Sequence, residues 1–231
     1  MQKILITFDI DGTLLKFGGN SAKHPIAFQK AFSEMFTPVD LPEKYLGKRL
    51  EGASDLLLAT KMIEKYGLKP NFSLLTSFQN RVESIYDDIL TESLDLTPGI
   101  IDLLEQISHS DKFLIGLATG NYKKIALKKL KLSKLDKYFH PLIGGFGDTA
   151  YNKEEILMEA SKNAELYCHT HNIQILHKIH IGDTIDDVNA AIKAQFFPIA
   201  VKTGRPNTIF PSSCLIMNNL LNSFHEIDNI Y

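Results

Sequence analysis

The sequence predicts a doubly wound α/β domain, in which helices cover both faces of a parallel sheet, with an all-helical domain inserted after the first strand. Two observations lead to this expectation. Short, nearly continuous apolar runs alternate with helical patterns along most of the chain, and that alternation is typical of parallel sheets. A long stretch after the first apolar run shows only helical patterns. We therefore expect a sheet-containing core that is interrupted by a helical insert.

The predicted strands are apolar runs without polar alternation, a pattern that suits strands buried on both faces; they span residues 3–8, 113–119, 141–146, 178–183 and 197–201. The predicted core helices have apolar residues at three- and four-residue spacing, and they span residues 99–110, 122–135, 153–169 and 186–194. Similar patterns in the insert predict helices at 24–36, 55–68 and 74–90. We assign residues 1–16 and 96–231 to the α/β core and residues 17–95 to the helical domain.

Composition limits the classes of function. The chain has 231 residues, is 44% hydrophobic and carries a formal net charge of −2, which argues against general binding to nucleic acid or to a membrane surface. Its two cysteines, Cys168 and Cys214, are too few for a disulfide framework and fit a reducing compartment. No segment approaches the ~18 consecutive apolar residues of a membrane helix. We expect a soluble, cytoplasmic protein that acts as a monomer or homodimer.

Two carboxylates follow the first predicted strand in the stretch "FDIDGTLL". Asp9 and Asp11 stand at the carboxyl end of that strand, where parallel α/β sheets bind ligands. Residues i and i+2 of a strand point to the same side, so both side chains are expected to face one cation or substrate. A simple turn explains the same residue types. A calcium-binding EF-hand loop is excluded, because Leu14 and Asn20 stand where glycine and glutamate are required.

A second pair of carboxylates ends the strand predicted at 178–183. Asp183 is its last residue, and Asp187 follows at the start of a helix, where it would serve equally well as an N-cap. A buried carboxylate is costly unless a positive charge compensates it. Magnesium prefers a few carboxylates together with water and phosphate oxygens. The four aspartates Asp9, Asp11, Asp183 and Asp187 therefore predict a Mg²⁺ site.

Two further segments suit a bound phosphate. In "LATGN", Thr119, Gly120 and Asn121 lie between a strand and a helix, where a hydroxyl and backbone N–H groups form an anion site, although ordinary helix capping explains Thr119 and Asn121 as well. Lys153 opens the helix predicted at 153–169 and would supply a positive charge.

Taken in order, these segments resemble the four motifs of the haloacid dehalogenase superfamily. "DIDGT" resembles the first motif, "ATGN" the second, Lys153 the third and "GDTIDD" the fourth. The helical insert resembles the C1 cap of that superfamily, on a Rossmann-like core. The third motif is the loosest match, because its lysine often precedes a proline and Glu154 follows here. Asp11 favours the phosphatase branch (phosphoglycolate phosphatase-like), since dehalogenases lack the second aspartate.

The resemblance implies a Mg²⁺-dependent phosphatase of small phosphorylated metabolites that works through an aspartyl-phosphate. Asp9 would attack phosphorus, and Asp11 would transfer protons to and from the reacting oxygens. The implied metal ligands are Asp9, the backbone carbonyl of Asp11, Asp183 and Asp187, and the implied phosphate ligands are Thr119, Gly120, Asn121 and Lys153.

The turn "EGASD" (51–55) resembles the one that cap domains of this superfamily point at the active site, which implies that Ser54 and Asp55 meet the substrate. Capping of the following helix is sufficient to explain Ser54. A phosphomutase or a pyrophosphatase would use the same core. A binding or regulatory protein that kept the scaffold without catalysis is the alternative from another class.

Two further segments allow other interpretations. Residues 168–180 contain Cys168 and four histidines, His169, His171, His177 and His180, but a zinc site needs its ligands to converge, and we interpret the cluster as incidental. Residues 121–137 carry seven lysines, which would suit a membrane surface or a partner. We interpret them instead as the solvated outer face of a helix that covers the sheet.

Overall fold

A parallel sheet forms the centre of the protein, as predicted, with one strand more than the five expected, in strand order β3-β2-β1-β4-β5-β6. The computed structural model describes residues 1–48, 52–206 and 208–231. The strands are β1 (Gln2–Phe8), β2 (Phe113–Ala118), β3 (Gly144–Gly145), β4 (Gln174–Gly182), β5 (Phe197–Val201) and β6 (Leu215–Met217). Because β1 lies between β2 and β4, the loops that follow these three strands emerge side by side at one edge of the sheet.

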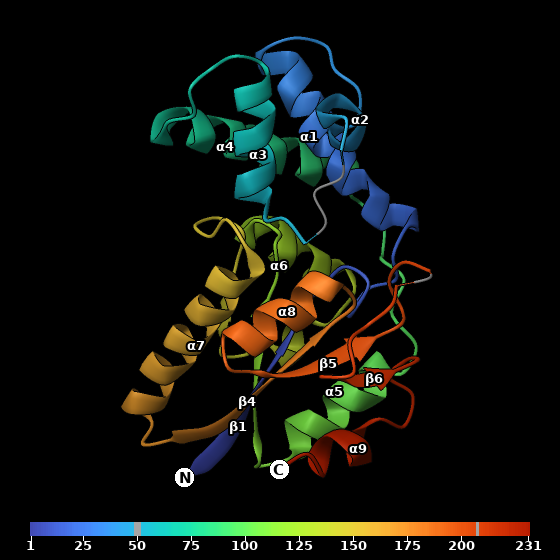
Figure 1. Ribbon diagram of the computed structural model, residues 1–231, viewed down its shortest axis with the longest axis vertical. Coiled ribbons are helices and arrows are strands. Elements are labelled where there is room, and N and C mark those ends of the chain that lie inside the picture. The colour runs from blue at the N-terminus through green and yellow to red at the C-terminus, as the bar shows by residue number, and fades with distance from the viewer. Residues whose placement is uncertain (49–51, 207) are drawn as a thin grey trace.

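Helices cover both faces of the sheet (Figure 1). The core helices are α5 (Ile100–His109), α6 (Lys123–Leu132), α7 (Lys153–Thr170), α8 (Ile185–Lys193) and α9 (Phe224–Asp228), with a short 3₁₀ helix at Asp136–Tyr138. Strand alternation decides which side chain meets which layer. Ile4, Ile6 and Phe8 pack into the core that contains the apolar faces of α5 and α6, whereas Leu5 packs against α7 and α8. The doubly wound prediction is confirmed.

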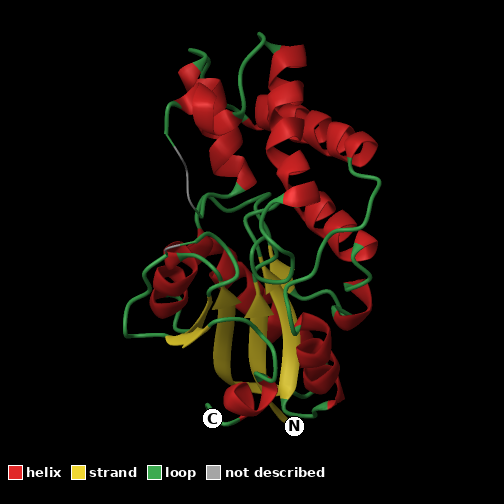
Figure 2. Cartoon of the chain, turned by 90° about the vertical axis from the view of Figure 1, so that its right-hand side faces the viewer, coloured by secondary structure: helices red, strands yellow, loops and turns green. Residues whose placement is uncertain are grey.

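The described residues from 19 to 89 build a separate layer of helices above the carboxyl ends of the strands (Figures 1 and 2). They form a 3₁₀ turn (Gly19–Ala22), α1 (Lys23–Met35), α2 (Pro42–Leu46), α3 (Asp55–Lys65) and α4 (Phe72–Ile89). The predicted helices correspond to α1, α3 and α4, whereas α2 and β6 are too short to show a periodic pattern. The division into two domains after residues 16 and 95 stays a prediction.

Aromatic side chains fill the helical layer and attach it to the sheet layer. Phe28 and Phe32 of α1 contact the ring of Phe78 of α4 edge-on, and Phe28 also stacks on Tyr122 at the start of α6, with ring centroids 5.9 Å apart. Such contacts add to the stabilisation from apolar burial. Across the described parts of the chain, no helix has both the length and the apolar content to cross a bilayer.

Candidate active site

Four of the predicted site residues come together where the central strands end. Asp9 follows β1, Asp183 follows β4, Asp187 lies in the first turn of α8, and Lys153 is the first residue of α7. Carboxylate oxygens of the three aspartates lie within 4.8 Å of one another, and all three residues are buried. The Lys153 Nζ lies 2.7 Å from Asp9 Oδ1 and 2.8 Å from Asp187 Oδ1. Two of the three carboxylates thus pair with one ammonium group, and that of Asp183 does not.

The electrostatics of this cluster favour a bound cation. Burial raises the pKa of Asp183 well above its usual range, and the nearby Asp187 and Asp9 raise it further. Burial also raises the pKa of Asp9, against the opposing effect of Lys153. Burial alone would lower the pKa of Lys153, but Asp187 and Asp9 raise it instead. A buried group of oxygen ligands with excess negative charge suits Mg²⁺, so the residues present fit that ion.

The carboxylate of Asp187, unlike that of Asp183, is paired with basic side chains. Burial would raise its pKa, but Lys153 and His180 lower it below the usual range. His180 Nε2 lies 3.4 Å from Asp187 Oδ1, and its Nδ1 lies 3.0 Å from the Thr7 hydroxyl. Thr184, not Asp187, is the N-cap of α8, but Asp187 takes part in the capping from the third helical position. Thr184 accepts from the Asp187 N–H, and the Asp187 carboxylate accepts from the Thr184 N–H in return.

Two glycines let neighbouring loops pack directly against Asp183. A Cβ on Gly12 would lie 2.3 Å from Asp183 Oδ2, and Gly12 has a φ of +88°, which disfavours other residues. A Cβ on Gly204, in the loop after β5, would lie 1.8 Å from the same oxygen. Thr203 donates its hydroxyl to the Gly12 carbonyl at 2.6 Å and so joins the two loops. Neither glycine position has room for a side chain.

The Asp11 carboxylate has different partners from that of Asp9. β1 ends at Phe8 and the chain turns immediately, and the Asp11 side chain is not part of the described carboxylate group that could hold a metal ion. That Asp9 and Asp11 face one substrate stays a prediction. Asp11 Oδ2 accepts from Lys129 Nζ at 2.5 Å and from Asn121 Nδ2 at 2.8 Å. Burial would raise the pKa of Asp11, but Lys129 and His24 lower it.

The Thr119–Asn121 segment links these two parts of the site. Thr119 is fully buried, and its hydroxyl accepts from Asn121 Nδ2 at 2.8 Å. The N-cap of α6 is Tyr122, which makes no capping bond with its side chain, so the capping alternative for Thr119 and Asn121 is wrong. The Gly120 carbonyl accepts from the Asp55 N–H at 2.8 Å.

The predicted turn of the helical layer reaches the site. Ser54 is buried and caps α3 by accepting from the Leu57 N–H at 3.1 Å, as the capping alternative proposed. Asp55 Oδ2 accepts from the Tyr122 N–H at 2.7 Å and lies 3.0 Å from His24 Nε2. The carboxylate of Asp55 is therefore already engaged by Tyr122 and His24, and its contact with a substrate stays a prediction. Arg49 and Glu51 lie outside the described residues.

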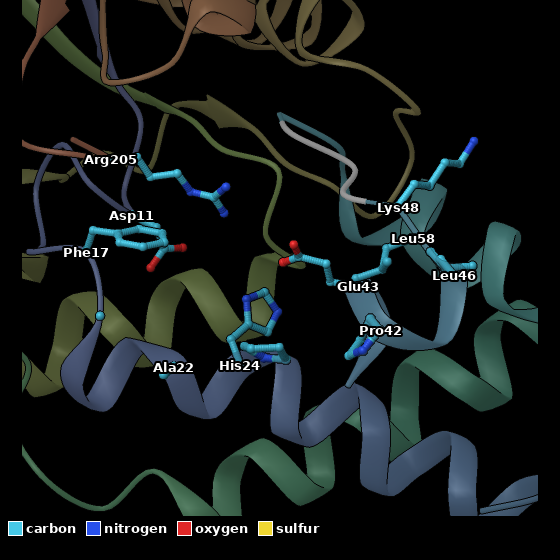
Figure 3. A pocket seen from close by; sticks show the side chains of 12 residues that line it. Asp11, Phe17, Ala22, His24, Pro42, Glu43, Leu46, Lys48, Leu58 and Arg205 are labelled. Atoms are coloured by element: carbon cyan, nitrogen blue, oxygen red, sulfur yellow. The ribbon is translucent and has the colours of Figure 1, made fainter. Parts of the chain in front are cut away.

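A cavity of about 390 Å³ opens beside Asp11. Figure 3 shows Arg205, Phe17 and Asp11 on one side of it and Leu46, Leu58 and Lys48 on the other. The Arg205 guanidinium lies 4.9 Å from the centroid of the Phe17 ring. Since α1, α2 and α3 supply one wall and the loops after β1 and β5 the other, both layers line the cavity.

Sequence reasoning missed several residues that contact this site. Lys129 is fully buried, so the interpretation of the lysine-rich helix as a solvated face is wrong for this residue. The available signal was its spacing, which places it on the same stripe as the buried Ile125, Ala126 and Leu130. His180 stands within the predicted run at 178–183, whose strand end is buried on both faces, so its position in the run already places it inside. His24 and Arg205 had no such signal, because only the tertiary fold brings them to the cavity.

The family model for haloacid dehalogenase-like hydrolases matches residues 6–201. The chain belongs to this family. It is 26% identical over 148 residues to the Phosphorylated carbohydrates phosphatase of Thermotoga maritima, in a match that covers 64% of this chain and 62% of that relative. The chain thus matches less than two thirds of the relative's length.

Solved structures of similar proteins share the fold. A hydrolase from Pseudomonas syringae has a TM-score of 0.69 at 19% identity, over 100% of this chain and 99% of that one. A predicted phosphoglycolate phosphatase from Haemophilus somnus has a TM-score of 0.66 at 16% identity, over 97% of each chain. The fold of this haloacid dehalogenase-like hydrolase is therefore shared along its whole length, including the helical layer.

Proposed function

We propose that the protein is a Mg²⁺-dependent phosphatase that hydrolyses a small phosphorylated carbohydrate or related metabolite through an aspartyl-phosphate. The observation that carries this proposal is the position of Asp9, bonded to Lys153 and grouped with Asp183 and Asp187, beside a cavity lined by Asp11. Membership of the hydrolase family and the name of the Thermotoga maritima relative support it.

The metal would be held by Asp9, Asp183 and Asp187, with the backbone carbonyl of Asp11 as the resemblance implies. When bound, it would screen the repulsion between the carboxylates and the phosphate dianion. Lys153 holds Asp9 through Oδ1, which fixes the carboxylate that acts as nucleophile. The Thr119 segment and Lys153 supply the donors and the charge that phosphoryl transfer requires.

In the reaction, an oxygen of Asp9 forms a bond to phosphorus while the bond from phosphorus to the leaving oxygen breaks. Asp11 gives a proton to that leaving oxygen, so that an alcohol departs. Asp11 then takes a proton from a water molecule as it attacks phosphorus, which releases inorganic phosphate and restores Asp9.

The cavity limits the leaving group. Its volume of about 390 Å³ lies near the lower end of the range of about 300–1,000 Å³ that is usual for small-molecule sites. Asp11 lines it, so the alcohol that leaves would occupy this space. A group of monosaccharide size fits better than a polymer or a protein side chain.

Release of inorganic phosphate from a panel of phosphorylated sugars and acids tests the proposal, with Mg²⁺ and with a chelator. We expect Mg²⁺-dependent release that Asp9→Asn abolishes and that Asp111→Asn, which changes an exposed aspartate, leaves unchanged. Metal-independent turnover or an active Asp9→Asn protein would contradict the mechanism. Isomerised product without phosphate release would indicate a phosphomutase, and binding without turnover would indicate a non-catalytic protein.

A further inference from the structure

Lys129 is a fully buried lysine next to the proposed acid and base. It lies on α6, and its ammonium group contacts Asp11 Oδ2 at 2.5 Å and Asn121 Oδ1 at 2.6 Å. A buried ammonium is expensive unless a charge partner and hydrogen bonds compensate it. Asp11 supplies the charge and Asn121 a second acceptor, so this lysine has a specific place in the site.

Three other lysines of α6 have different surroundings. Lys124 and Lys128 pair with Asp87 of α4 at 3.1 and 3.3 Å, and Lys131 is exposed. Of these four side chains, only that of Lys129 is fully buried. Helix packing alone does not account for a charged residue at this position, because an apolar side chain would pack equally well on the buried face of α6.

The contacts around Asp11 divide its two carboxylate oxygens. Oδ2 receives both donors, Lys129 Nζ and Asn121 Nδ2, while Oδ1 is buried and has no hydrogen-bond partner among the described residues. Asn121 also donates to the Thr119 hydroxyl. The contacts that hold Asp11 are therefore connected to the predicted phosphate-binding segment. The carboxylate is therefore held in place through Oδ2 alone.

We propose that Lys129 is a positioning residue for Asp11: together with Asn121 it holds the carboxylate through Oδ2, in the orientation from which the carboxyl group exchanges a proton with the leaving oxygen and with water. This inference rests on the proposed function, since it assigns a role within that reaction. Lys129 itself touches neither substrate nor phosphorus, and it acts only through the orientation of Asp11.

The test compares two substrates that differ in their need for a proton. An alkyl phosphate such as glycerol phosphate must have its leaving oxygen protonated, whereas p-nitrophenyl phosphate releases a stable phenolate. The measured quantity is kcat/KM, which reports the steps up to formation of the phosphoenzyme. For Lys129→Met we expect a loss of about 10²–10⁴-fold with glycerol phosphate, the usual worth of acid–base catalysis, and less than about 10-fold with p-nitrophenyl phosphate.

Matched variants separate positioning from a structural role. Lys131→Met removes a positive charge from the exposed face of the same helix and should leave kcat/KM unchanged for both substrates. Asp11→Asn should show the same split as Lys129→Met, and the double variant should be no worse than Asp11→Asn, because residues that act as a unit are not additive. Equal losses on both substrates in Lys129→Met, or additive losses in the double variant, would overturn the inference.

Failures of the inference and of the proposed function are distinguishable. A wild-type protein that hydrolyses neither substrate would overturn both, whereas a split in Asp11→Asn without one in Lys129→Met would overturn the inference alone. If Lys129→Met does not fold, Asp11→Asn/Lys129→Met should fold again, because it no longer buries an uncompensated carboxylate, and Lys129→Gln then carries the kinetic comparison. A double variant that fails equally would contradict the pairing.

Discussion

Asp183 and Asp187 belong to one acidic cluster, yet neutralising them should change stability in opposite directions when no metal is bound. Oxygens of Asp183 lie within 4.8 Å of oxygens on Asp9 and Asp187. At that distance Coulomb's law with an effective dielectric constant of about 20 gives about 3.5 kcal/mol of repulsion for each pair of unit charges. Lys153 offsets part of this repulsion, and we expect Asp183→Asn to stabilise the protein by about 1–3 kcal/mol.

Asp187→Asn should instead destabilise the protein. The Asp187 carboxylate contacts Lys153 at 2.8 Å and His180 at 3.4 Å. Removing one partner of a buried ion pair costs about 3–5 kcal/mol. We expect a net loss smaller than this, because the variant also relieves the repulsion with Asp183, and the lowered pKa of Asp187 shows that its attractive contacts outweigh that repulsion.

The pH dependence follows from the sign of the Asp183 shift. Its folded-state pKa is raised, so the wild-type protein loses stability as pH rises from the ordinary aspartate value of about 3.9 through that raised pKa. The advantage of Asp183→Asn should therefore grow with pH over this window. It should vanish well below pH ~3.9, where the carboxyl is protonated in both the folded and the unfolded protein.

Thermal unfolding in the presence of a chelator measures both effects. For a chain of this length each kcal/mol moves the Tm by roughly 2–4 °C, and Asp111→Asn serves as the exposed control. A lower Tm for Asp183→Asn at neutral pH would refute the electrostatic account of the cluster. Shifts of the same sign in both variants would refute it too.

Three further predictions concern the surroundings of this cluster. Gly204→Ala should lose Mg²⁺-dependent activity, because the new Cβ would lie 1.8 Å from Asp183 Oδ2; wild-type turnover in this variant would contradict the packing. Asp55→Ala should lower the free energy of unfolding in urea by about 2–3 kcal/mol, since it leaves the buried Tyr122 N–H without an acceptor, and an unchanged unfolding midpoint would argue against that link between the layers. Added Mg²⁺ should raise wild-type stability by about 2.7 kcal/mol at 100 times its Kd, and an equal gain in Asp183→Asn would show that the ion binds elsewhere.

The parts of the fold that the sequence predicted are those with long, regular patterns. The run at 197–201 corresponds to β5 residue for residue, and the pattern at 153–169 to α7 within one residue. α2 and β6 were missed because five and three residues are too short to show a period. The run at 141–146 contains only the two-residue β3, because its first two apolar residues, Pro141 and Leu142, lie in an exposed loop.

The site divides in a similar way. Asp9, Asp183, Asp187 and Lys153 were predictable because each stands at the end of a strand or the start of a helix, and a parallel sheet brings such positions to one edge. The Asp11–Lys129 contact was not, since it joins residues 118 positions apart and depends on how α6 packs against the loop after β1. The sequence pattern thus predicts which charged residues stand at strand ends, whereas which of them form ion pairs depends on tertiary packing.

Phosphate bound covalently to Asp9 is the central claim, and trapping it gives the most direct test. Asp11→Asn should accept phosphate from p-nitrophenyl phosphate and then hydrolyse the phosphoenzyme slowly, because it lacks the base for the second step. Borohydride reduces an acyl phosphate to an alcohol, which would convert the phosphorylated residue to homoserine. Peptide mass mapping should then find homoserine at position 9, and none after treatment of Asp9→Asn/Asp11→Asn. Homoserine at another aspartate, or none at all in an enzyme that turns over, would contradict the account.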